Sequence, residues 1–180
     1  MQLYTVGHGT LPADTFGALV GDASLEQVVD VRSYPGSRRN PHFAREQMEQ
    51  WLPTTGVEYR WMRELGGRRR PVPNSKHVAL RNDSFQAYAD YMETDDFRAG
   101  VARLLDLAAE QASAVMCSES VWWRCHRRLL ADHLVLIERL DVLHLMHDGR
   151  LVTHPPTPGV RVEQEMLVYD VGVTPELPGT

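Results

Sequence analysis

The sequence is poor in cysteine and in lysine. Its 180 residues include two cysteines, and of its nineteen basic residues only Lys76 is a lysine. Two cysteines eight positions apart do not form a disulfide framework, so we expect free thiols, as in a reducing compartment. No apolar run reaches the roughly 18 residues of a membrane span, and the first residues do not resemble a signal peptide. The sequence therefore predicts a cytoplasmic protein with no membrane partner.

The charge is unevenly distributed along the chain. The net charge is −5, yet residues 32–81 contain eleven basic and four acidic residues, whereas the rest contains eight basic and twenty acidic ones. Arginine suits bidentate recognition of phosphate or carboxylate groups. Codon bias accounts for arginine in place of lysine, but not for its concentration in one third of the chain.

Hydrophobic periodicity predicts strands that alternate with helices. We expect strands at 3–6, 27–31, 57–61, 114–116 and 142–145, an edge strand at 149–152, and helices at about 12–20, 42–52, 84–91, 95–111 and 125–140. This alternation implies right-handed βαβ units. The predicted fold class is α/β, a single-domain three-layer Rossmann-like fold with a mainly parallel sheet. The domain is expected to cover residues 1–154, and a proline-rich, loosely attached tail residues 155–180.

Chemically reactive side chains follow several of the predicted strands. Parallel strands end at one common edge, where open α/β sheets bind their ligands. The residues expected at this edge are Gly7, His8, Arg32, the residues after Trp61, Cys117, Ser118, Glu119 and the start of the helix at Cys125. Their convergence makes this edge the candidate functional site.

The two cysteines are candidate nucleophiles. Cys125 is expected at the N-terminus of a helix, beside His126 and Arg127, so the helix dipole and positive charge are expected to lower its pKa. His126 or His8 would act as the base, with Glu119 orienting it. The alternative is that a cysteine is a small buried apolar residue, which fits Cys117 better. The catalytic candidates are Cys117, Glu119, Cys125 and His8.

The same edge offers groups for an anion. Helix N-termini bind phosphates and carboxylates, and basic residues at a helix start are unfavourable unless an anion compensates them. The ligand-binding candidates are Arg32, Tyr34, Arg38, His126 and Arg127. Structural pairing is the alternative, in which Asp30 holds Arg32 or Arg127, or Glu119 holds Arg127.

The sequence does not predict a metal site, although potential ligands are present. Cys117, Cys125, His126 and His8 offer sulfur and nitrogen ligands, but adjacent residues of a helix point about 100° apart. Their spacing matches no zinc signature. The expectation is therefore that Cys125 and His126 do not share a metal.

Three further features remain open. Arg68, Arg69 and Arg70 follow two glycines, and we favour a solvated, mobile loop over a polyanion contact. Of the adjacent Trp122 and Trp123, one is expected to cover the pocket as a lid or to form a protein contact. His144 lies in an apolar strand and is interpreted as a hydrogen-bonded core histidine.

These motifs together resemble those of the DUF488 family, a domain of unknown function. The resemblance is carried by residues 5–8, 30–38, 65–67, 116–119 and 125–127, with Phe43, Tyr59, Phe85, Tyr88, Tyr91, Met92 and His144 between and after them. The family usually has serine where this chain has Gly9, and often alanine in place of Ser118. The resemblance implies an α/β domain with a ligand site or an enzymatic activity.

The leading functional hypothesis is an enzyme or ligand-binding domain acting on a small anionic ligand, such as a nucleotide or a phosphorylated metabolite. One alternative is a nucleic-acid-binding module that uses the basic segment 32–81. Another is a non-catalytic protein-interaction domain. The sequence indicates neither a cofactor nor an oligomeric state.

Overall fold

A computed structural model describes residues 1–36 and 38–172. Its centre is a six-stranded sheet with the strand order β3-β2-β4-β1-β5-β6. The strands are β1 (Gln2–Gly7), β2 (Gln27–Asp30), β3 (Glu58–Trp61), β4 (Ser113–Cys117), β5 (Asp141–Leu145) and β6 (Leu151–Thr153). β1 to β5 pair in parallel, and β6 is an antiparallel edge strand beside β5. The expected mainly parallel sheet is thus confirmed.

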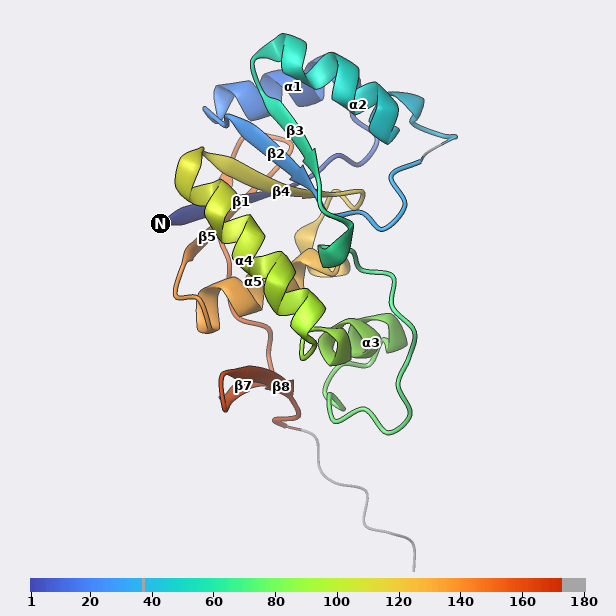
Figure 1. Ribbon diagram of the computed structural model, residues 1–180, viewed down its shortest axis with the longest axis vertical. Helices are drawn as coiled ribbons and strands as arrows, with labels where there is room; N and C mark the ends of the chain where they lie inside the picture. The colour runs from blue at the N-terminus through green and yellow to red at the C-terminus, as the bar shows by residue number, and fades with distance from the viewer. Residues whose placement is uncertain (37, 173–180) are drawn as a thin grey trace, which may run out of the picture.

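Helices cover both faces of the sheet (Figure 1). The helices are α1 (Ala13–Asp22), α2 (Arg45–Trp51), α3 (Asp83–Tyr91), α4 (Asp95–Glu110) and α5 (Arg127–Leu136). Phe16 of α1 and Met48 of α2 pack into one apolar cluster, whereas α3, α4 and α5 contribute to a second. α1 and α2 bury apolar side chains on one face of the sheet and α4 and α5 on the other, which gives the three layers of a Rossmann-like fold, while α3 packs beside α5.

The strand order places a crevice beside the centre of the sheet. After β1 the chain moves to β2 and β3, and it then returns to insert β4 between β2 and β1 before adding β5 on the other side. β4 and β1 therefore end side by side, with Cys117 opposite Gly7 in register. Ligands of open α/β sheets bind at such a switch point. The residues that follow β1, β2 and β4 meet there.

The last central helix is shorter than the sequence predicted. α5 ends at Leu136 rather than near Leu140. Arg139 adopts a positive φ of 60°, and the Leu140 amide donates back to the Leu134 carbonyl. This left-handed residue turns the chain out of the helix and into β5.

The segment after residue 154 is not loosely attached where the structure describes it. It forms the hairpin of β7 (Val160–Glu163) and β8 (Met166–Tyr169). Tyr169 is fully buried, and its hydroxyl donates to the Asp132 carboxylate of α5 over 3.0 Å. The prolines do not prevent packing, because the hairpin is anchored through side chains. The division of the chain at residue 154 stays a prediction, and residues 173–180 of the expected tail lie outside the described residues.

Among the described residues, no helix combines the length and the apolar character that crossing a bilayer requires.

Candidate functional site

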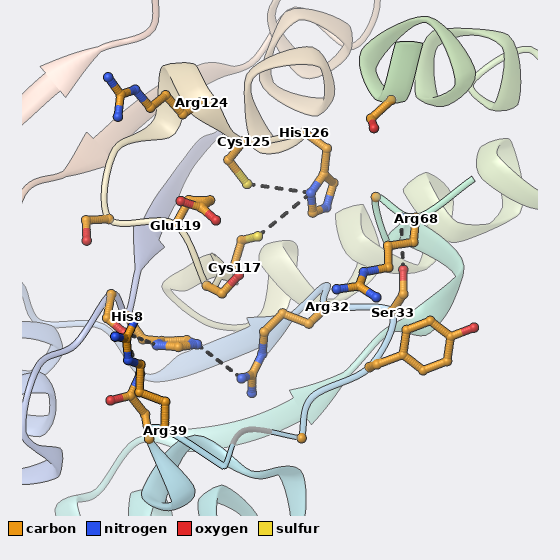
Figure 2. A pocket seen from close by; sticks show the side chains of 18 of the residues that line it. His8, Arg32, Ser33, Arg39, Arg68, Cys117, Glu119, Arg124, Cys125 and His126 are labelled. Carbon is orange, nitrogen blue, oxygen red and sulfur yellow. Dashed lines mark hydrogen bonds between the residues drawn. The ribbon is translucent and has the colours of Figure 1, made fainter. Parts of the chain in front are cut away.

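A pocket of about 590 Å³ opens at the carboxyl edge of the sheet (Figure 2). Its lining includes His8, Arg32, Tyr34, Gly36, Arg39, Gly67, Arg68, Cys117, Glu119, Arg124, Cys125 and His126. They follow β1, β2, β3 and β4, the ends that the topology brings together. All four candidate catalytic residues line this one pocket. Their catalytic roles stay predictions.

The floor of the pocket holds both thiols around one imidazole. Nδ1 of His126 lies 3.8 Å from Sγ of Cys117 and 3.5 Å from Sγ of Cys125, as the dashed lines of Figure 2 show. Hydrogen bonding from Cys125, with the nearby His126 and Arg127, holds the pKa of Cys117 well below its ordinary value despite burial. Burial and the neighbouring Cys117 raise the pKa of Cys125. The sequence predicts a lowered pKa for Cys125 from the helix dipole and its positive neighbours, and this prediction is wrong because burial outweighs them.

Cys125 precedes α5 instead of belonging to it. It is extended, with φ −124° and ψ 151°, and His126 is the N-cap of the helix. The expected divergence of about 100° between these two side chains is therefore wrong. Because one of the pair is outside the helix, Cys117, Cys125 and His126 bring their ligand atoms within 4.8 Å of one another.

Arg32 is bound mainly to the protein. Its Nε and Nη2 donate to the Asp30 carboxylate at 2.9 and 2.6 Å, and Nη2 also donates to the Phe43 carbonyl. The Tyr59 hydroxyl donates to the same carboxylate over 2.6 Å. Both residues are buried, so Arg32 and Asp30 form the structural ion pair that the sequence offers as the alternative to anion binding. Nη1 alone turns towards His8, 3.1 Å from its Nε2.

His8 is held as a neutral ring. Arg32 has only protons to offer, so Nε2 of His8 accepts, and Nδ1 donates to the Gly9 carbonyl over 2.9 Å. Burial, together with the charge of Arg32, lowers the pKa of His8 to about 4. The ring also stacks on Phe43, with centroids 4.1 Å apart. His8 is therefore fixed at the edge of the pocket. The lone pair of its Nε2, which a general base would use, already accepts a hydrogen bond from Arg32.

Arg127 does not line the pocket. Its side chain is 1% exposed, and Nη2 donates to the main-chain carbonyls of Glu119 and Ser120. Arg127 was predicted to bind an anionic ligand, with a pair to Glu119 or Asp30 as the alternative, and the structure shows main-chain carbonyls as its partners instead. With this geometry Arg127 supports the loop after β4 from below, and the Glu119 side chain remains exposed at the pocket.

Three exposed arginines at the rim were not among the candidates. Arg39, Arg68 and Arg124 line the pocket, whereas the candidate Arg38 is exposed and is not one of the described lining residues. The loop of Arg68 is held to the site: its amide donates to the Ser33 hydroxyl, and its guanidinium lies 5.8 Å from the ring centre of Tyr34. The run of glycines and arginines was visible in the sequence, but nothing local showed that it returns to the sheet edge.

The two tryptophans do not cover the pocket. Trp122 stacks on His144 with ring centres 4.3 Å apart, and Trp123 is 46% exposed beside it. His144 is 1% exposed and hydrogen-bonded to Thr5 and His154. The prediction that His144 is a hydrogen-bonded core histidine is confirmed. Neither tryptophan is among the described residues that line the pocket, so the expected tryptophan lid is not formed there.

The sequence pattern of one family, described as "Domain of unknown function DUF488", matches residues 12–134, which is more than half of the chain. The chain belongs to the DUF488 family. No curated protein and no solved structure matches it. The DUF488 match includes both cysteines, His126 and all the pocket arginines. The floor and the rim of the pocket are thus parts of the family domain.

Proposed function

We propose that this DUF488 protein is an enzyme that acts on a small anionic substrate, a nucleotide or a phosphorylated metabolite, bound in the pocket at the sheet edge. The observation that carries the proposal is the set of three exposed arginines at the rim of the pocket. Arg39, Arg68 and Arg124 line one pocket, and none of the ion pairs between described residues involves them. Unpaired arginines around a concave site favour phosphate or carboxylate ligands.

The pocket size supports a small ligand over a nucleic acid. A volume of about 590 Å³ lies within the range of small-molecule and cofactor sites. A charged ligand would lie between the rim arginines and the floor of Cys117 and His126, with Glu119 beside it. The floor supplies reactive groups and the rim supplies affinity. We also propose a cytoplasmic location, since both cysteines are free thiols.

The test is thermal and chemical unfolding of the full chain with a panel of nucleotides, sugar phosphates and short oligonucleotides at low salt. A ligand at a hundred times its Kd stabilises the folded protein by about 2.7 kcal/mol. We expect one small anion to give such a shift. Arg39→Ala, Arg68→Ala and Arg124→Ala should each weaken binding, and Arg38→Ala, the neighbouring exposed arginine, is the matched control.

Other outcomes would replace the proposal. Stabilisation by oligonucleotides alone, with an affinity that falls steeply with salt, would indicate a nucleic-acid-binding module. No shift with any anion, or equal effects of Arg38→Ala and Arg39→Ala, would contradict the anion site and leave a protein-interaction domain as the function to test.

A further inference from the structure

We propose that Cys117, Cys125 and His126 bind a zinc ion whose fourth coordination position faces the pocket. The three side chains come from two segments, the end of β4 and the turn before α5, yet they converge on one point. A cysteine nucleophile needs one thiol and one base. Here two thiols approach the same nitrogen atom, and this arrangement is the one expected of a shared metal.

The distances fit tetrahedral zinc. Zinc–sulfur bonds are about 2.3 Å and zinc–nitrogen bonds about 2.0–2.1 Å, so a tetrahedral site separates its sulfur and nitrogen atoms by roughly 3.5 Å. The two sulfur–nitrogen distances are 3.8 and 3.5 Å. Two thiolates and one imidazole are a ligand set that zinc favours.

The surroundings hold these ligands in place. The Arg127 amide donates to Sγ of Cys125 over 3.5 Å, which stabilises a thiolate. The His126 ring packs edge-on against Tyr88, with centroids 5.0 Å apart, and a Cβ on Gly67 would collide with it. Nε2 of His126 is buried with no hydrogen-bond partner among the described residues, whereas Nδ1 faces both sulfur atoms. With the ring proton on Nε2, the lone pair of Nδ1 points to the position of the metal.

The site is open on one side. All three residues line the pocket, so a fourth ligand would enter from it. Structural zinc sites have four protein ligands, whereas catalytic sites keep one position for water or substrate. Glu119 lies outside the three-residue cluster but lines the same pocket, and its carboxylate is exposed there. The arrangement is therefore of the catalytic kind.

Such a centre would specify the reaction class as hydrolysis, and this step rests on the proposed function. Zinc lowers the pKa of bound water to about 7. The water would give one proton to the Glu119 carboxylate, and its oxygen would bond to the electrophilic carbon or phosphorus of the anionic substrate. Glu119 would return that proton to the leaving group as its bond breaks. The rim arginines would orient the substrate for this attack.

The test measures the metal itself in the full chain, purified without chelators. Elemental analysis should find about one zinc ion per chain, and X-ray absorption at the zinc edge should show two sulfur neighbours, one nitrogen and one further light atom. Cobalt substitution should give thiolate-to-metal charge-transfer absorption. Cys117→Ser, Cys125→Ser and His126→Asn should each lose stoichiometric zinc.

Two pairs of variants separate loss of zinc from loss of folding: Gly67→Ala with Gly36→Ala, and His126→Asn with His8→Asn. Gly67→Ala displaces the His126 ring and should weaken zinc binding on the order of tenfold or more, whereas Gly36→Ala adds a Cβ in the same pocket that meets no atom within 4 Å. His8→Asn changes a pocket histidine outside the cluster and should retain zinc.

Wild-type protein that contains no zinc and takes up neither zinc nor cobalt in excess would overturn this proposal. A zinc edge without sulfur neighbours would do the same. If anion binding and its dependence on Arg39 then persisted, the proposed function would stand without the metal. Zinc bound at the cysteines without any anion binding would instead contradict the proposed function and leave the metal site intact.

Discussion

The guanidinium of Arg127 donates to the main-chain carbonyl of Glu119 over 2.7 Å. The donor is at the start of α5 and the acceptor is in the loop after β4, so this bond joins the two segments that carry the two cysteines. An arginine that looks like an anion ligand in the sequence thus supports the floor of the site from inside the protein.

Replacing Arg127 by lysine should destabilise the protein. Lysine keeps the charge, but its shorter side chain does not bring a nitrogen to the position of Nη2, the atom that donates to both carbonyls. A lost hydrogen bond to a charged group costs about 1.5–3 kcal/mol. Urea unfolding measures this change. Arg128→Lys, at a half-buried neighbour that lies over the Phe85 ring, is the control and should cost less. Equal losses in both variants would show that Arg127 does not hold the loop.

Replacing Gly7 by alanine should disturb the same loop. A Cβ at Gly7 would collide with the Glu119 carbonyl and lie 2.8 Å from Nη2 of Arg127. Overpacking of this kind costs about 1–3 kcal/mol. Gly21→Ala in α1 meets no atom within 4 Å and should be neutral or stabilising, because alanine favours helix. Matching unfolding midpoints for the two variants would contradict the close approach at Gly7.

The buried pair of Asp30 and Arg32 leads to a third prediction. Asp30→Asn removes the charge and places an amide donor against groups that only donate to this side chain, so unfolding should become easier by about 3–5 kcal/mol. Tyr59→Phe removes one hydrogen bond from the same carboxylate and should cost about 1 kcal/mol. The order of the two losses, measured by chemical unfolding, is the test; a larger loss for Tyr59→Phe would contradict it.

Stability should fall as the pH drops below about 6.5. Burial, then the neighbouring His154 and Arg127, lowers the pKa of His144 to about 3. Between that value and the unfolded value near 6.5, the unfolded state binds the extra proton, so acid favours unfolding. One histidine contributes a slope of up to about 1.4 kcal/mol per pH unit in this window.

The measurement is urea unfolding from about pH 4.5 to about pH 7.5, a range that contains the unfolded pKa near 6.5 and stays above the folded pKa of about 3. His144→Gln should reduce the slope. His8→Asn should also reduce it, because the pKa of His8 is lowered to about 4. Slopes that match wild type in both variants would mean that neither ring is held neutral.

The C-terminal hairpin should be necessary for full stability. Leu167 and Tyr169 belong to the same apolar cluster as α3, α4 and α5, and Asp132 binds the Tyr169 hydroxyl and the Thr157 amide. A chain that ends at residue 154 loses these contacts and should unfold at least about 3 kcal/mol more easily. A chain that ends at Gly172 keeps them and is the reference. Equal stability would support the division of the chain at residue 154.

The sequence by itself determined the fold class and the sheet edge at which the pocket lies. Apolar runs such as 28–31 and 114–116 reveal buried parallel strands, because both faces of such a strand are covered. The order of strands and helices then fixes a common edge for the groups that follow them. His8, Cys117 and Glu119 were therefore expected at one pocket, and the structure places them there.

Only the tertiary structure decided which groups face the pocket and which face each other. The extended backbone of Cys125, the return of Arg68 to the sheet edge and the inward turn of Arg127 all depend on contacts between distant segments. Local periodicity carries no information about such contacts. Successive residues of a helix point about 100° apart. Because α5 begins at Arg127, two residues later than expected, this angle does not apply to Cys125 and His126, and both side chains lie beside Cys117.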